Sequence, residues 1–226
     1  LRSVRGVVRG DVAEAVEQAQ RARRLLPEEY LYFRRLVVRS LGAALLYRGG
    51  VVEAQPLFEE DARLSRQAGD ITGLLAATRL WAASLMARGR LRQAREVLAA
   101  AEPHLPLAPG MLQPAAIKLL VVQADLLREC NELEEAAGLC EKAIGQAQAV
   151  LDLYGLGANL MLARVRLAQG RVDDRLAAIE EALRLAKRYD ITDLDDALVY
   201  ASRARLFLDG GDLEAAAAWS RECGLD

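Results

Sequence analysis

Residues 82–94 read Ala82-Ala83-Ser84-Leu85-Met86-Ala87-Arg88-Gly89-Arg90-Leu91-Arg92-Gln93-Ala94, and this stretch decides the fold of the chain. Its pattern is a small residue, a large apolar residue, a glycine, an aliphatic residue and an alanine at fixed spacing. The glycine can end one helix, because it adopts a positive φ without steric cost. The aliphatic residue and the alanine lie three apart, on one face of a second helix. The stretch therefore predicts an antiparallel helix hairpin.

The pattern recurs along the whole chain. Its junctions are Gly10-x-Val12-x-x-Ala15, Gly49-x-Val51-x-x-Ala54, Gly89-x-Leu91-x-x-Ala94, Asn131-x-Leu133-x-x-Ala136, Gly170-x-Val172-x-x-Arg175 and Gly211-x-Leu213-x-x-Ala216, spaced by 39, 40, 42, 39 and 41 residues. Seven positions before each junction stands a small residue: Ser3, Gly42, Ala82, Ala124, Ala163 and Ala204. Four positions before it are mostly large apolar residues: Leu45, Leu85, Leu127 and Phe207. A period of about 40 residues is typical of a stacked helical array, and this pattern is the core of a tetratricopeptide-type repeat.

The predicted fold is all-α. We expect a right-handed superhelix (α-solenoid) of about five to six tetratricopeptide-like antiparallel helix hairpins, with a period of ~40 residues. First helices are expected at residues 30–48 and 72–88, and second helices at 51–68 and 91–101. Helix N-caps are predicted at Asp70, at Asp152, and at Thr192 or Asp193. The longest interruption of the helical pattern runs from residue 103 to residue 110 and contains three prolines and a glycine.

Residues 1–226 are predicted to form a single superhelical domain that is a fragment of a longer protein. The chain begins at Leu1 with a charged segment, and the pattern enters in the middle of a repeat. At the other end no helix follows to cover Leu213 and Trp219, whereas terminal repeats normally carry a polar cap.

Composition narrows the possible functions. The net charge is −2, with 30 basic and 32 acidic residues, and this balance lacks the basic excess of a nucleic-acid-binding domain. The three cysteines form no CxxC pair, which favours reduced thiols in a cytoplasmic protein. No apolar run reaches the ~20 residues that a membrane-spanning helix needs.

Five short segments of the chain resemble a known family. The segments are residues 9–15 (RGDVAEA), 40–42 (SLG), 89–94 (GRLRQA), 162–170 (LARVRLAQG) and 218–225 (AWSRECGL), and they resemble the helical repeat region of MalT-like, LuxR-type transcriptional regulators. Two positions depart from the pattern. Asn131 replaces a junction glycine, which is tolerable because asparagine also adopts positive φ. Arg175 replaces a junction alanine, which puts close packing of that repeat in question.

The resemblance implies a function. In that family the repeat region senses a small-molecule effector or a protein partner and controls an ATP-dependent nucleotide-binding module and a helix-turn-helix domain on either side of it. These residues contain no G-x-x-x-x-G-K-[ST] loop and no segment for a recognition helix. We therefore expect a non-enzymatic, cytoplasmic sensor and interaction domain that has no cofactor. We expect it to contact neither nucleic acid nor membrane directly. A homo-oligomer is compatible with this function. One alternative is a generic tetratricopeptide adaptor that binds a peptide. The other is a hydrolase embedded in a helical array.

Candidate binding residues follow from the repeat geometry. In tetratricopeptide-like arrays the first helices line the concave face. On that basis the groove-facing residues are predicted to be Arg39, Tyr47, Arg79, Lys118, Asp125, Arg128, Arg164 and Arg205. A row of arginines suits a carboxylate, a phosphate or an acidic peptide. The alternative is that these arginines are solvated or form ion pairs within their repeats.

Catalytic and metal chemistry finds little support in the sequence. His104 is the sole histidine and lies in a predicted loop without a second histidine or a nearby cysteine. Adjacent acidic residues in helices, such as Glu134 and Glu135, point about 100° apart and so form solvated faces rather than acid–base pairs.

Overall fold

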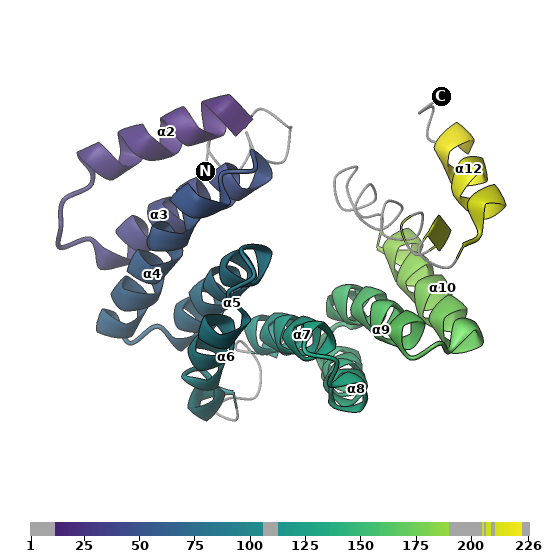
Figure 1. Cartoon of the computed structure of the whole chain (residues 1–226). Coiled ribbons are helices and arrows are strands. Elements are labelled where there is room, and N and C mark those ends of the chain that lie inside the picture. The colour runs from purple at the N-terminus through teal and green to yellow at the C-terminus, as the bar shows by residue number, and fades with distance from the viewer. Residues whose placement is uncertain (1–11, 106–112, 190–204, 206, 209–210, 223–226) are drawn as a thin grey trace. The chain divides into compact units, whose positions relative to one another are not determined.

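The structure is a computed structural model that describes residues 12–105, 113–189, 205, 207–208 and 211–222. The side chains of Val12, Tyr47, Gln113, Trp219, Ser220 and Glu222 are not among the described ones. Within these ranges the regular structure is helical and contains no strand, which confirms the all-α prediction (Figure 1). The chain divides into two compact units, Leu1–Val122 and Gln123–Asp226, and each is described by itself.

The first unit holds the helices α2 (Val12–Leu25), α3 (Leu31–Tyr47), α4 (Val51–Gln67), α5 (Ile71–Ala87), α6 (Leu91–Ala99), the 3₁₀ turn η1 (Glu102–His104) and the beginning of α7 (Gln113–Glu129). The second unit holds the end of α7 and α8 (Leu133–Val150), the 3₁₀ turn η2 (Asp152–Gly155), α9 (Leu156–Ala168), α10 (Val172–Arg188) and α12 (Leu213–Glu222). The predicted helices of the first unit agree with these bounds to within two residues.

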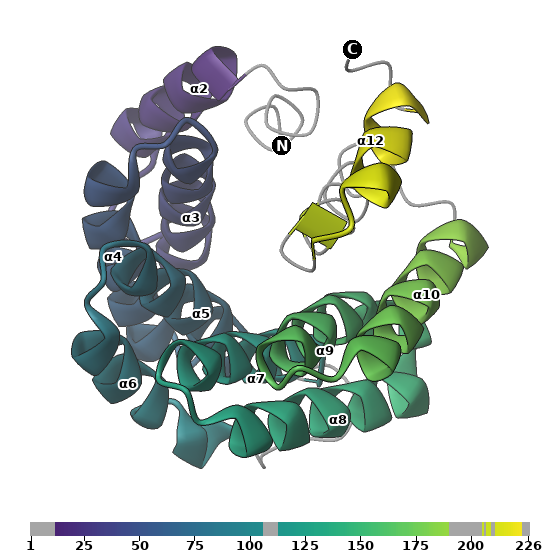
Figure 2. The ribbon, with the colours of Figure 1, turned by 45° about the vertical axis from the view of Figure 1, so that its right-hand side comes forward.

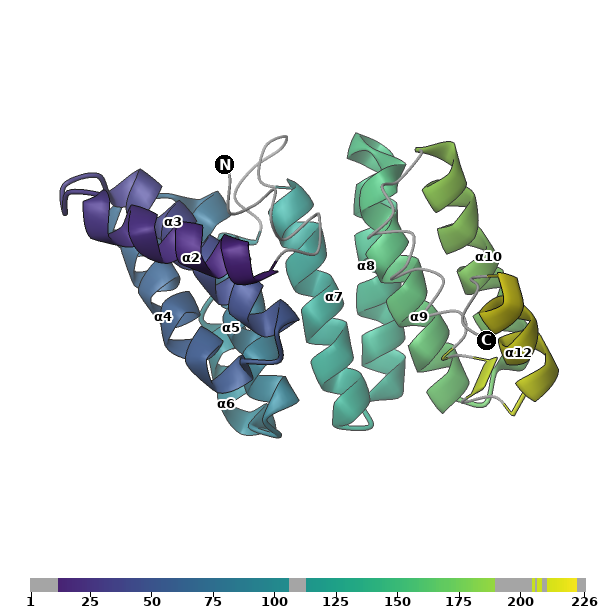
Figure 3. The same cartoon turned by 90° about the horizontal axis from the view of Figure 1, so that it is seen from above.

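Consecutive helices pack against each other as antiparallel pairs. In the first unit α3 contacts α2, α4 and α5, and α5 contacts α4 and α6. There α3 and α5 form one layer, and α4 and α6 form the other (Figure 2). In the second unit α8, α9 and α10 lie side by side in chain order (Figure 3). Each unit is thus a stack of helix hairpins.

The junction residues end the first helices as predicted. Gly49, Gly89, Gly170 and Gly211 have φ of 84°, 69°, 74° and 78°. At Gly49 the N–H groups of Gly50 and Gly49 donate to the carbonyls of Leu45 and Leu46 at 2.8 and 2.9 Å, which is the Schellman arrangement. The same pair of hydrogen bonds recurs at Gly89, Asn131, Gly170 and Gly211, and also at Gly69 between α4 and α5. The large residue four positions before the junction therefore supplies the carbonyl that closes the turn. Gly10 lies outside the described residues.

Asn131 is the one described residue other than glycine with a positive φ, at 61°. We expect Asn131→Ala to lower the free energy of unfolding by about 1 kcal/mol, because a left-handed backbone costs an ordinary side chain about 1–2 kcal/mol. Asn131→Gly should leave stability equal or slightly higher. Urea denaturation of the two variants measures the difference. Equal losses in both would show that the asparagine side chain, rather than φ, matters at this turn.

The small residues allow the helices to approach closely. Ala82, Ala124 and Ala163 are fully buried, and a Cβ added at Gly42 would lie 2.6 Å from Cε1 of Phe58. Ser3 and Ala204 lie outside the described residues. On the second helices, the alanines after the junctions are buried too: Ala15, Ala54, Ala94, Ala136 and Ala216.

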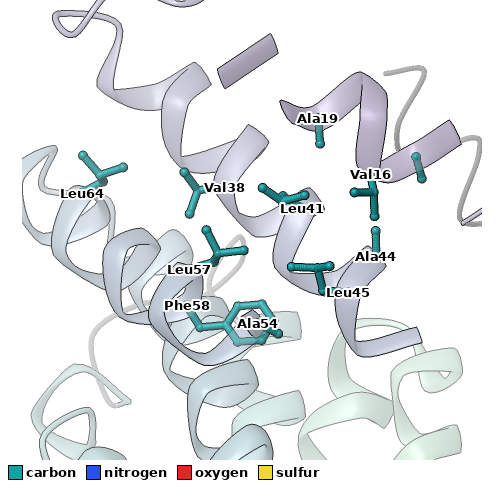
Figure 4. Close-up of a cluster of buried hydrophobic side chains, with 11 residues drawn as sticks. Val16, Ala19, Val38, Leu41, Ala44, Leu45, Ala54, Leu57, Phe58 and Leu64 are labelled. Atoms are coloured by element: carbon teal, nitrogen blue, oxygen red, sulfur yellow. The ribbon is translucent and has the colours of Figure 1, made fainter. Parts of the chain in front are cut away.

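The core of the first unit joins three helices. Figure 4 shows Val16 and Ala19 of α2 facing Leu41 and Ala44 of α3, while residues of α4, with Phe58 fully buried, close the cluster from the other side. Burying each large side chain of this kind contributes about 1.5–3 kcal/mol relative to leaving it exposed. The cluster therefore holds α2, α3 and α4 together.

Two local expectations concern Arg175 and the helix N-caps. Arg175 is buried on α10, and α9 and α10 pack closely around Ala163, Ala178 and Ile179, so this repeat keeps its packing. Asp70 caps α5 by accepting a hydrogen bond from the Gly73 N–H at 2.7 Å, as predicted.

The predicted cap at Asp152 is wrong. Leu151 is the N-cap of η2, and Asp152 forms no cap hydrogen bond at the start of η2 or of α9. Its carboxylate instead accepts hydrogen bonds from the Tyr189 hydroxyl and from Arg188 at 2.7 Å, because the end of α10 returns to this turn. These bonds join residues 36 and 37 positions apart, which local patterns cannot reveal. Thr192 and Asp193 lie outside the described residues.

Candidate ligand- and partner-binding surface

Seven of the eight predicted binding residues lie on first helices of the hairpins. Arg39 is on α3, Arg79 on α5, Arg164 on α9, and three of the set are on α7: Lys118, Asp125 and Arg128. Arg79 is half-buried, and Lys118 and Arg205 are exposed. These last three residues each interact with other residues of the protein. Tyr47 ends α3, and its side chain is outside the described ones.

The second unit brings three of the predicted residues together. Asp125 accepts hydrogen bonds from Nε and Nη2 of Arg128 at 3.1 and 2.8 Å, within α7. From α9, Nη1 of Arg164 lies 3.3 Å from the same carboxylate oxygen. The side chains of Asp125, Arg128 and Arg164 are 25%, 17% and 44% exposed. We call these three residues the Asp125 cluster.

Arg128 is committed to this cluster. Burial works to lower its pKa, but hydrogen bonds and charges from Asp125 and Glu129 raise the pKa above its usual value, so the guanidinium stays charged. Glu129, next to Arg128, also accepts a hydrogen bond from it. The negative charges of Asp125 and Glu129 thus offset the positive charge of Arg128 and part of that of Arg164.

Arg164 is the cation of the cluster that can take a further partner. Within the described part of the chain its guanidinium makes one ion pair, to Asp125, through Nη1. Nε and Nη2 remain as donors on a side chain that is nearly half exposed, and a guanidinium presents such donors in a fork that matches a carboxylate or a phosphate.

The helix that carries Arg164 is held firmly on α8. Two residues further along α9, Arg166 donates to Glu141 of α8 at 2.6 Å and to Gln169 at 2.8 Å. Gln169 in turn donates to Glu134 of α8 at 3.3 Å. These bonds fix α9 on α8, so the position of Arg164 does not depend on a loop.

Arg39 has a different role, in the first unit. Its Nε and Nη2 donate to the two carboxylate oxygens of Asp61 at 2.5 and 3.1 Å, and Nη2 also donates to the Gly73 carbonyl at 2.9 Å. Asp61 is fully buried on α4. Burial raises the pKa of Asp61, while the hydrogen bond and charge of Arg39 and the charge of Arg35 oppose the rise. Arg39 therefore joins α3, α4 and α5.

Arg35 was not among the predicted residues, although it lies one turn before Arg39. It is 5% exposed, forms an ion pair with Asp70, and its guanidinium carbon lies 4.5 Å from the ring centroid of Tyr32. The spacing of Arg35 and Arg39 on α3 was the one available signal, because their acidic partners lie 35 and 22 positions away, respectively.

The described residues also include the histidine His104 and the cysteines Cys130 and Cys140. His104 is half-buried in η1. Cys140 is buried and unpaired, and burial raises the pKa of its thiol to about 12. Among the described residues, no group of three or more His, Cys, Asp or Glu side chains could hold a metal ion. In the same ranges no helix is long and apolar enough to cross a bilayer.

The hairpins, their Schellman turns and their small-residue contacts define a helical repeat domain of the tetratricopeptide type, a class that presents interaction surfaces. The chain belongs to the MalT-like TPR region family, which matches it over residues 1–226. This confirms the family resemblance and the α-solenoid class. No curated protein matches the sequence.

Solved structures share the fold. The TPR-like repeats of a putative kinesin light chain from Podosopora anserina are 21% identical, with 83% of this chain and 92% of that chain covered and a TM-score of 0.61. BtubC (BKLC) from P. vanneervenii is 17% identical over 94% of this chain and 87% of its own, with a TM-score of 0.63. A Rap protein complexed with Competence and Sporulation Factor is 13% identical over 96% of this chain and 60% of its own, with a TM-score of 0.79.

Proposed function

We propose that this chain is the ligand-sensing and protein-interaction domain of a transcriptional regulator. It acts without catalysis and in the cytoplasm, as one domain of a longer protein. Membership of the MalT-like TPR region family over residues 1–226 carries this proposal. A bound effector or partner would shift the equilibrium between two states of the regulator, to the extent that it binds one state more tightly.

The proposed contact is a carboxylate of the effector or partner on Arg164. Its free donors, its exposure and its firm attachment to α8 support this assignment. The Rap structure, of the same fold, was solved with a bound factor, which supports binding by such a fold in general. Tyr47, Arg79, Lys118 and Arg205 remain proposed binding residues, each within its own unit.

Substitution of Arg164 tests the contact. As probe we choose a fluorescein-labelled hexapeptide of alternating glutamate and leucine, with a lysine–leucine hexapeptide as charge control. Arg164→Ala should weaken binding of the acidic peptide at least about fivefold, because a charge-assisted hydrogen bond is lost. The melting temperature should change little, because an exposed ion pair contributes little to stability. Fluorescence anisotropy and differential scanning calorimetry measure the two effects.

The matched control is Arg171→Ala. Arg171 is half-exposed in the same unit and pairs with Asp174 of its own helix turn at 2.5 Å. Equal affinity of wild type, Arg164→Ala and Arg171→Ala would reject Arg164 as a contact. Tighter binding of the lysine peptide would reject the carboxylate.

The regulator context has its own test. The proposal predicts that the parent gene encodes a phosphate-binding loop before this region and a helix-turn-helix after it. A parent gene with neither module would favour the generic tetratricopeptide adaptor that binds a peptide partner. Analytical ultracentrifugation with and without the neighbouring modules then tests self-association.

A further inference from the structure

The helix α6 is much shorter than the second helices α4, α8 and α10. It has 9 residues, whereas these three have 17, 18 and 17. The missing length corresponds to about two helical turns. Where α6 stops, α4 and α5 leave a hollow of about 250 Å³ in the first unit. We call it the α6 hollow.

The hollow has a mostly apolar lining and charged sides. Two charged residues contribute to it, and the others are Leu74, Thr78, Trp81, Val97, Ala100 and Ala101. Arg66 comes from the last turn of α4, and Glu96 comes from α6. The two charges are therefore held on different helices that both pack against α5.

Both charged groups can accept a partner. Arg66 is exposed and has no ion pair within the described part of the chain. Glu96 pairs with Arg92 at 3.3 Å, with side-chain exposures of 64% and 93%. Such an exposed pair is weak and easily exchanged for a ligand.

We propose that the α6 hollow binds a free apolar α-amino acid as a zwitterion. An apolar cavity of ~150 Å³ suffices for benzene, and drug-sized ligands occupy about 300–1,000 Å³, so 250 Å³ suits a molecule of leucine size. The carboxylate pairs with Arg66 and the ammonium group with Glu96. The apolar side chain packs on Leu74, Trp81 and Val97 and removes their exposed surface from water.

This inference does not rest on the proposed function. The hollow belongs to the first unit and the Asp125 cluster to the second, and each is tested with its own variants. Loss of peptide binding in Arg164→Ala would say nothing about amino-acid binding in the α6 hollow. Failure of amino-acid binding likewise says nothing against the family assignment.

Trp81 supplies the signal for the experiment. The chain has two tryptophans, so Trp219→Phe leaves Trp81 in the hollow as the single one. We titrate this variant, after checking its circular dichroism, with L-leucine, N-acetyl-L-leucine and L-leucinamide. L-Leucine should shift the Trp81 emission and bind at least about tenfold more tightly than the two blocked compounds, each of which lacks one charge. Calorimetry with the unmodified chain provides a second reading.

Substitutions of Arg66 and Glu96 test which charged group of the ligand each residue contacts. Arg66→Gln should remove the preference for L-leucine over L-leucinamide, and Glu96→Gln the preference over N-acetyl-L-leucine. Ala100→Leu, at an exposed lining position, should abolish binding by filling the hollow. The matched control is Arg63→Gln, because Arg63 is exposed on the same helix and bonded to Gln67 at 3.1 Å, and it should bind L-leucine as wild type does.

Three results would overturn the proposal. The first is no heat and no emission change up to about 10 mM ligand, well beyond a Kd of 1 mM. The second is unchanged binding in both Arg66→Gln and Ala100→Leu. The third is N-acetyl-L-leucine or L-leucinamide binding as tightly as L-leucine, since these mimic a peptide C-terminus and N-terminus and would indicate a peptide end instead.

Discussion

Arg39→Leu is expected to lower the free energy of unfolding by about 3–5 kcal/mol, the loss typical when one partner of a buried ion pair is removed. The Arg39 side chain is 22% exposed and its partner Asp61 is fully buried. Without Arg39, the Asp61 carboxylate keeps a hydrogen bond from Ser65 at 3.4 Å and the more distant charge of Arg35. Urea denaturation followed by circular dichroism at neutral pH measures the loss.

The double variant Arg39→Leu/Asp61→Leu should recover most of that stability, because a buried ion pair replaced by apolar residues is often neutral. Arg92→Leu is the control: its pair with Glu96 is highly exposed and should contribute less than about 1 kcal/mol. If the double variant is as unstable as Arg39→Leu alone, packing rather than charge explains the loss.

The loss should also depend on pH in a defined direction. Burial raises the pKa of Asp61 above its unfolded value, and removal of Arg39 raises this pKa further. A raised carboxyl pKa means that the folded state binds the proton more tightly, so stability falls as pH rises through that pKa. The difference between Arg39→Leu and wild type is therefore largest at neutral pH and shrinks as acid protonates Asp61. A difference that grows in acid would contradict this account.

Gly42→Ala should lower the free energy of unfolding by about 1–2 kcal/mol. The new Cβ would lie 2.6 Å from Cε1 and 3.0 Å from Cζ of the buried Phe58 ring. Overpacking of this kind costs about 1–3 kcal/mol, and the better helix propensity of alanine returns at most about 1 kcal/mol. Chemical denaturation measures the net change.

Gly138→Ala is the matched control in the interior of α8. Gly138 is exposed, and a Cβ there would meet nothing within 4 Å, so this change should raise stability by about 0.5–1 kcal/mol. Phe58→Leu should relieve part of the Gly42→Ala loss. A stabilising Gly42→Ala would show that the Phe58 ring moves aside at little cost.

The hairpin turns were predictable because their cause is local. A positive φ, a glycine or asparagine to adopt it and a carbonyl four positions before that residue all lie within one short segment, as at Gly89 and Asn131. The buried small residues were predictable for the same reason, since Ala82 and Ala163 keep a fixed distance from their turns.

The charged residues were harder to predict. Arg39 and Arg164 both lie on first helices, yet Arg39 bonds a buried carboxylate, whereas Arg164 makes one exposed ion pair within the described part of the chain. The short α6 was predictable, because the helix was expected to end by residue 101, and it ends at Ala99. The α6 hollow was not predictable, because it depends on how α4, α5 and α6 pack.

The amino-acid sequence by itself therefore determined the class of fold, the hairpin period, the turn conformations and the family, because these depend on residues close together in the chain. The tertiary structure alone decided which charges pair and where a hollow opens. Those outcomes depend on side chains 22 to 39 positions apart that meet only when the helices pack, as Arg39 meets Asp61 and Arg164 meets Asp125. The physical reason is that pairing and burial are set by distance in space, whereas helix and turn propensity are set along the chain.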